Sequence, residues 1–164
     1  MPLPRLRSVL VCGMLFVFAL RFSQLTINCK GCALMIILVA GSRNWSDGTL
    51  IQLIVNRLRA LPADTLIIHG ACQGVDTHAG LIARKLGLRV QEFRPQWSIY
   101  GPPAGPIRNL KMLNAGPDRV VCFHDNLAKS KGTRHLIKHA NARRIPVELW
   151  TSKNRHLNFW LRGV

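Results

Sequence analysis

The sequence predicts an α/β fold of three layers, with a mainly parallel sheet of about five strands at its centre. Two observations predict it. Short apolar runs, most of them rich in β-branched residues, alternate along the chain with longer segments whose apolar residues recur at helical spacing. The first of these runs, residues 36–40, is apolar throughout, which is typical of a strand buried on both faces of a parallel sheet.

The strands are predicted from the short runs. The clearest begins at Ile36, is apolar throughout and is ended by Gly41, whereas the third run alternates in character. The expected strands are residues 36–40, 65–69, 89–93, 119–123 and 146–149.

The helices between them are predicted from apolar spacing and from the residues at their ends. Asp47-Gly48 introduces the first helix and Pro62 ends it, while Gly87 closes the second. Residues 94–106 hold four prolines and are expected to form a loop that crosses an edge of the sheet. The expected helices are residues 48–61, 75–86, 107–115 and 133–143. This alternation of strands and helices predicts a Rossmann-like three-layer sandwich with right-handed crossovers.

Two basic segments flank the domain at residues 35–150. Residues 1–34 form an N-terminal extension whose apolar run at 9–20 follows two arginines. That run is shorter than the roughly 18 to 20 residues that cross a bilayer, so we expect no membrane partner. Because Met35 directly precedes the first strand, we expect the extension to be an over-extended reading frame. Residues 151–164 form a basic tail in which no pattern predicts an element.

The formal net charge is +16, and residues 35–150 carry sixteen Lys or Arg against seven Asp or Glu. A basic domain suits an anionic ligand or weak nucleic-acid binding, and a solvated basic surface is the alternative. The five cysteines, an odd number, favour a reducing, cytoplasmic setting over a disulfide framework. Cys29 and Cys32 form a single Cys-x-x-Cys without a second pair or suitably spaced histidines, so we expect no metal.

Four glycine-bearing loops lie at the ends of the predicted strands or at the starts of the predicted helices. Ligands of open parallel sheets bind beyond the carboxyl ends of the strands, where the strand order reverses. Glycine lets the backbone approach a ligand, and free N–H groups at a helix start bind anions. A tight turn explains each loop alone, but convergence of all four favours a phosphorylated ligand. The expected ligand-binding residues are Gly41, Ser42, Arg43, Gly70, Gly74, Asp76, Arg108, Asn109, Gly132 and Thr133.

Four residues near these loops have more specific expectations. Asp76 is expected to cap or steady helix 75–86, with a direct ribose contact as the alternative. Arg108 is expected at the start of helix 107–115, where a cation is unfavourable unless a bound anion compensates it. Trp97 and Tyr100, in the proline-rich loop, are candidates to cover a base by stacking, and for Trp97 packing against the sheet edge is the expected role.

As an ordered set, these motifs resemble one family. They are Gly41-Ser42-Arg43, His69-Gly70-Ala71-x-x-Gly74-Val75-Asp76, Trp97, Ala104-Gly105-x-x-Arg108-Asn109-x-x-Met112 and Gly132-Thr133. Over residues 35–150 the chain resembles the YspA-type, cpYpsA-related branch of the SLOG superfamily, named after the Smf/DprA and LOG proteins. The resemblance implies a Rossmann-like fold that binds nucleotides or nucleotide-derived small molecules. Its members are bacterial and phage proteins, some of which act as ligand sensors.

The resemblance leaves three functions open. The first, which we expect, is binding or sensing of a nucleotide or nucleotide-derived phosphorylated small molecule, with no cofactor. The second is a phosphoribohydrolase-like activity as in the LOG enzymes, whose arginine Arg108 would match. Their glutamate shortly after the Gly-Thr motif has no counterpart here, because Arg134 follows Thr133, so no catalytic residue is assigned. The third is DprA-like single-stranded DNA binding on the basic surface. The sequence leaves open whether the protein forms a homo-oligomer.

Overall fold

The structure is a computed structural model that describes residues 34–45, 47–153 and 157–159. In chain order its elements are β1 (Ile36–Gly41), α1 (Gly48–Arg59), β2 (Leu66–His69), α2 (Val75–Lys85), β3 (Arg89–Glu92), α3 (Trp97–Tyr100), α4 (Ala104–Asn114), β4 (Arg119–Phe123), the 3₁₀ helix η1 (Leu127–Lys129), α5 (Lys131–Ala142), β5 (Val147–Trp150) and β6 (Leu157–Phe159). The expectations for the N-terminal apolar run and for Cys29 and Cys32 lie outside the described residues.

The predicted α/β Rossmann-like fold is confirmed. The strands form one sheet in the order β3-β2-β1-β4-β5-β6. Strands β1 to β5 are parallel to one another, and β6 is antiparallel to β5. Each predicted strand lies within one or two residues of an observed one.

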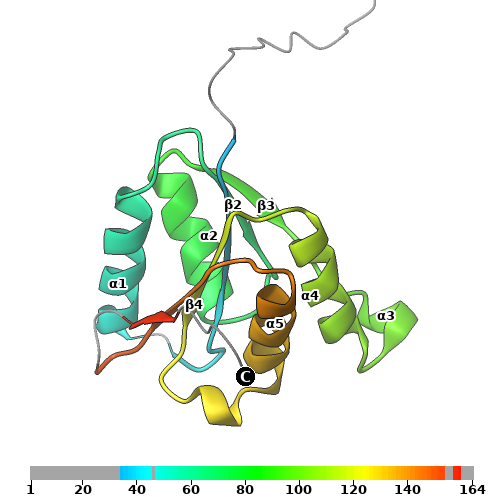
Figure 1. Cartoon of the computed structure of the whole chain (residues 1–164). Helices are drawn as coiled ribbons and strands as arrows, with labels where there is room; N and C mark the ends of the chain where they lie inside the picture. The colour runs from blue at the N-terminus through cyan, green and yellow to red at the C-terminus, as the bar shows by residue number, and fades with distance from the viewer. Residues whose placement is uncertain (1–33, 46, 154–156, 160–164) are drawn as a thin grey trace, which may run out of the picture. The chain divides into compact units, whose positions relative to one another are not determined.

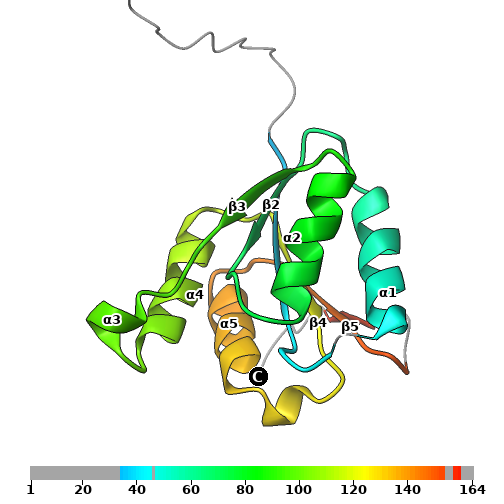
Figure 2. The ribbon, with the colours of Figure 1, turned by 180° about the vertical axis from the view of Figure 1, so that it is seen from behind.

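Helices cover both faces of the sheet, with α1 and α2 on one side and α4 and α5 on the other (Figures 1 and 2). Alternate residues of β1 lie on opposite faces of the sheet. Ile37 and Val39 pack with α1 and α2, whereas Leu38 and Ala40 pack with α4 and α5. Side chains that alternate in this way bury both faces of the strand. This explains why the run is apolar throughout.

Helix α1 begins where the sequence predicts it. The carboxylate of Asp47 accepts hydrogen bonds from the Leu50 N–H at 2.9 Å and from Trp45 Nε1 at 3.0 Å. The first bond is an N-cap, because it satisfies an N–H that the helix itself leaves without a partner. The second ties the loop after β1 to the same carboxylate.

The segment between β3 and β4 differs from the prediction. Residues 97–100, expected in a loop, form the short helix α3, which ends at Gly101 with a positive φ of 54°. Helix α4 begins at Ala104, three residues before the predicted start. Pro106 lies in its first turn, where a missing N–H costs nothing, so this proline does not mark a loop.

Strand β6 was not expected, since it lies in the segment predicted to be a basic tail. It pairs with β5 through Val147–Phe159, Glu148–Asn158 and Leu149–Leu157. The chain before β6 is also held, because the Ser152 N–H donates to Asp125 Oδ1 at 2.6 Å. A strand of three residues is defined by its neighbour rather than by its own pattern, so periodicity does not predict it.

Candidate functional site

The strand order reverses between β1 and β4, and the loops that follow them meet there. The Ser42 N–H donates to the Phe123 carbonyl at 2.9 Å, and the Val75 N–H donates to the Ser42 carbonyl at 3.1 Å. Gly74 has a φ of 78°, and a Cβ on it would lie 2.4 Å from the Ser42 oxygen. Only glycine allows both this backbone conformation and this close approach. The motif after β1 therefore packs on the start of α2.

The loop between β2 and α2 is held from within by Asp76. Its Oδ2 accepts from the N–H of Gly70 at 3.1 Å and from that of Cys72 at 3.3 Å. The Ala71 N–H donates to His69 Nδ1 at 3.1 Å. The expectation that this loop offers free N–H groups is therefore wrong for these three residues, whose donors are used inside the loop. Asp76 steadies the loop rather than capping α2.

Arg108 is buried, with 8% of its surface exposed. Its Nη1 lies 3.5 Å from Asp76 Oδ2, and its Nη2 donates to Cys72 Sγ at 3.3 Å. The guanidinium fills the space beside Gly70, because a Cβ there would lie 1.0 Å from Nη1. Within the described part of the chain, Nε and Nη1 have no hydrogen-bond partner.

The prediction that Arg108 lies at the start of its helix is wrong. It is the fifth residue of α4 and not its first, so it does not lie at the positive end of the helix dipole. Its charge is balanced instead by Asp76. Burial raises the pKa of Asp76 to about 6, against the Arg108 charge and the N–H groups of Cys72 and Gly70, which lower it.

The middle of α4 is joined to the start of α5 by Asn109, whose Nδ2 donates to the Gly132 carbonyl at 3.1 Å. Thr133 is buried, and its N–H donates to the N-cap residue Ser130 at 3.2 Å. The predicted residues thus form one contiguous set, in which α4 links the β2–α2 loop to the start of α5.

A cavity of about 630 Å³ lies beside this set. It is lined by Arg43, His69, Ala71, Cys72, Gln73, Thr77, Leu81, Arg84, Glu92, Arg94, Pro95 and Trp97. Of the ten predicted residues, all of which the structure describes, only Arg43 lines it. The cavity runs along one face of α2, since Thr77, Leu81 and Arg84 are spaced by four and three residues. The end of β3 and Trp97 complete the wall.

Arginines outnumber carboxylates in this wall. Arg84 Nη2 donates to Glu92 Oε1 at 2.6 Å, and Arg94 Nη2 donates to Glu92 Oε2 at 3.1 Å. These hydrogen bonds lower the pKa of Glu92, which is therefore ionised at neutral pH. Arg43 adds a third positive charge, so the lining has three guanidinium groups and one carboxylate. This excess of positive charge attracts anions.

His69 lies in the same wall and is buried. Burial lowers its pKa, so the ring is neutral at pH 7. Because Nδ1 accepts from the Ala71 N–H, the proton of the neutral ring is on Nε2. Nε2 has no hydrogen-bond partner among the described residues and lies 3.9 Å from Glu92 Oε1.

The cavity lining also includes side chains that the sequence does not predict as ligand-binding, among them Leu81, Arg84, Glu92 and Arg94. Two signals could have found them. Leu81 and Arg84 follow Thr77 at the spacing of one helix face, beside a glycine loop. Glu92 and Arg94 stand at the carboxyl end of the third strand, where ligands of such sheets bind.

Within the described ranges no three His, Cys, Asp or Glu side chains gather to hold a metal ion. The same part of the chain contains no helix with the length and apolar character needed to cross a membrane. Cys72 and Cys122 are free thiols.

Comparisons with known proteins agree with this fold. The model of the YspA, cpYpsA-related SLOG family matches residues 35–100. The Gene 61 protein of Mycobacterium phage D29 is 34% identical over 119 residues, which cover 68% of this chain and 92% of that protein. The X-ray structure of DNA processing protein A (DprA) from Streptococcus pneumoniae aligns with a TM-score of 0.58 at 14% identity, over 71% of this chain and 50% of that chain. That likeness concerns the fold alone. From the family match and the phage relative together, the chain belongs to the YspA, cpYpsA-related SLOG family.

Proposed function

We propose that the protein binds a nucleotide or a nucleotide-derived phosphorylated small molecule in the cavity beside the β2–α2 loop. The observation that carries the proposal is the lining itself, in which three arginines stand against one carboxylate at the carboxyl edge of a parallel sheet. Membership of the SLOG family supports it.

Arg43 is the residue best suited to a phosphate. It is exposed, it lines the cavity, and it follows β1 at the point where the strand order reverses. A guanidinium can donate two parallel hydrogen bonds to phosphate oxygens. The other predicted residues hold the wall: Gly74 brings the Arg43 backbone onto the start of α2, and Arg108 with Asp76 fixes the loop around Cys72.

Isothermal titration calorimetry with nucleoside mono-, di- and triphosphates and ADP-ribose tests the proposal. We expect one of them to bind, and Arg43→Ala to weaken that binding about tenfold or more, the effect of losing a charge-assisted hydrogen bond. Arg59→Ala is the matched control, because Arg59 is an exposed arginine in the last turn of α1, outside the cavity lining. The proposal fails if no compound of the panel binds, or if both variants weaken binding equally.

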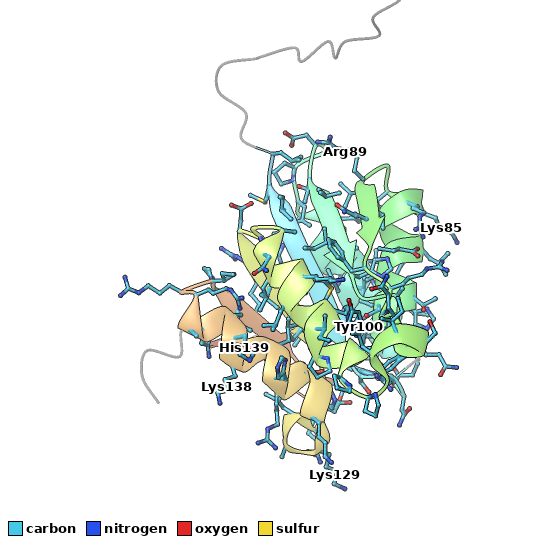
Figure 3. The ribbon with its side chains drawn as sticks, turned by 90° about the vertical axis from the view of Figure 1, so that its right-hand side faces the viewer. Lys85, Arg89, Tyr100, Lys129, Lys138 and His139 are labelled. Carbon is cyan, nitrogen blue, oxygen red and sulfur yellow. The ribbon has the colours of Figure 1, made fainter. Side chains whose placement is uncertain are left out.

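A second candidate function is binding of single-stranded nucleic acid, favoured by the outer face of α5. Between Asp125 and Glu148 the chain carries six Lys or Arg and no acid. All six are exposed, and Lys129 and Lys138 project from this side of the molecule in Figure 3. Lys131, Arg134 and Lys138 share one face of α5, Lys129 precedes the helix, and Arg143 and Arg144 follow it.

Fluorescence anisotropy with a labelled oligo-dT strand distinguishes this candidate from a merely solvated surface. The double variant Lys131→Ala, Lys138→Ala should weaken binding and make the slope of log K against log salt shallower by about 1.4, or 0.7 for each lost phosphate contact. The control is the double variant Arg59→Ala, Lys85→Ala, which removes the same charge elsewhere. Equal effects of the two double variants would mean that net charge, and not this face, drives binding.

A further inference from the structure

A phosphate bound at Arg43 would leave one part of the cavity unoccupied. We call it the β3 end of the cavity: Leu81 and Arg84 from α2, Glu92 from β3, and Arg94, Pro95 and Trp97 after it. A second phosphate is a weaker occupant here than at Arg43, since the guanidiniums of Arg84 and Arg94 already donate to Glu92 and its charge offsets theirs. The occupant that this end fits is a neutral group.

Two large apolar side chains stand open at this end. Trp97 is 49% exposed and Leu81 is 51% exposed, although both line the same cavity from different helices. Trp97 is also supported from α4, because a Cβ on Gly105 would lie 3.4 Å from its Cη2. An indole held on one side and open on another is suited to stacking on a flat aromatic ring.

The polar groups at this end are hydrogen-bonded to one another. Glu92 accepts from Arg84 on one oxygen and from Arg94 on the other. A carboxylate oxygen can accept more than one hydrogen bond, so Glu92 can still accept from a ligand N–H. The flanking guanidiniums can donate to ligand nitrogen or carbonyl acceptors. Donors and acceptors side by side are what the edge of a nucleobase presents.

We propose that the β3 end of the cavity is a nucleobase subsite, in which Trp97 and Leu81 hold the base and the Arg84–Glu92–Arg94 cluster contacts its edge. This proposal rests on the proposed function, which gives the phosphate of the same ligand to Arg43. The ligand class is thus a nucleoside phosphate, with its base at the β3 end of the cavity.

Calorimetry on the full chain with GMP, AMP, UMP and ribose 5-phosphate tests the subsite. The best nucleotide should bind at least about tenfold more tightly than ribose 5-phosphate, since stacking of a base on an aromatic side chain contributes this much. Trp97→Leu should bring that nucleotide close to the affinity of ribose 5-phosphate without changing ribose 5-phosphate itself, and Trp97→Phe should retain most of the difference. Glu92→Gln should change the order of affinities among the three bases.

Tyr100→Leu is the matched control, because Tyr100 is an exposed aromatic residue of the same helix that does not line the cavity. It should leave all four affinities unchanged. If nucleotides bind no better than ribose 5-phosphate, or if Trp97→Leu and Tyr100→Leu have equal effects, the subsite is wrong and the phosphate site stands. If none of the four compounds binds the unaltered chain, the subsite is wrong, and the wider panel of nucleotides and ADP-ribose decides the proposed function.

Discussion

At the scale of single residues, Gly70 and Arg108 depend on each other. The guanidinium of Arg108 lies where any side chain at position 70 would be, and it meets Asp76 there. The site is thus built around a buried charge that only a glycine leaves room for. Such a pair contributes little net stability when intact, but it is costly to break.

Gly70→Ala should therefore lower the free energy of unfolding by about 3 kcal/mol, since displacing the guanidinium leaves Asp76 without its buried counter-charge. Urea unfolding followed by circular dichroism measures the change. The control is Gly48→Ala at the start of α1, where a Cβ would meet nothing within 4 Å. The control should change stability by less than about 1 kcal/mol. Equal stabilities of the two variants would contradict the packing described here.

The order of the motifs along the sequence identifies residues that lie together in the fold. It does not predict the contacts between them. The glycine at position 74 and the arginine at position 43 were identified from their places beside strand ends, which the alternation of elements predicts. The burial of Arg108 could not be predicted in the same way, because it depends on the space beside Gly70, 38 positions earlier in the chain. Contacts of this kind are fixed by packing and leave no local pattern.

At the scale of elements, long periodic segments were predicted well and short ones poorly. The four long helices and five parallel strands carry enough apolar positions for their period to be seen. Helix α3 has four residues, little more than one helical turn, and strand β6 has three, so neither shows a repeat, and each is defined by what it packs or pairs with. The start of α4 was misplaced because Pro106 occurs equally in loops and in the first turn of a helix.

The N-cap of α1 gives a prediction at this scale. Asp47→Ala should lower the free energy of unfolding by about 1 kcal/mol, because the Leu50 N–H loses its acceptor and Trp45 Nε1 loses the same oxygen. Asp47→Ser should recover part of the loss, since serine is also a good N-cap. Thermal unfolding of the unaltered protein and the two variants measures these changes. A serine variant that is no more stable than the alanine variant would contradict the capping role of Asp47.

At the scale of the whole domain, Glu148 joins three elements. It accepts from Arg57 Nε at 2.7 Å and Nη2 at 2.9 Å on α1, from Arg119 on β4, and from Trp150 Nε1 at 3.3 Å on β5. Burial by itself raises the pKa of Glu148, but the hydrogen bonds from Arg57 and Arg119 outweigh it and lower the pKa to about 2. The cluster therefore holds a helix and two strands together through one charge.

A lowered pKa makes the folded domain sensitive to acid. The contribution of Glu148 is complete above its usual pKa of 4.5 and is lost as the pH falls toward about 2. Asp76 acts with the opposite sign: its pKa is raised, so its contribution to stability declines as the pH rises from about 4 to about 6.

Glu148→Gln should lower the free energy of unfolding by on the order of 3 kcal/mol at pH 7, and below pH 4.5 the variant should lose less stability with falling pH than the unaltered protein does. Urea unfolding from pH 2 to pH 7 checks this, and an unchanged acid limb in the variant would contradict it.

The two edges of the sheet bear on how copies of this domain meet. Edge strands that are long, flat and apolar invite another sheet to pair with them, and aggregation follows. Here the outer strands are β3, which is four residues long and reads Arg-Val-Gln-Glu, and β6, which has three residues. Neither offers a long apolar ladder. For the part of the chain that the structure describes, pairing of sheet edges between copies is therefore disfavoured, and fibre formation through these two edges is not expected at high concentration.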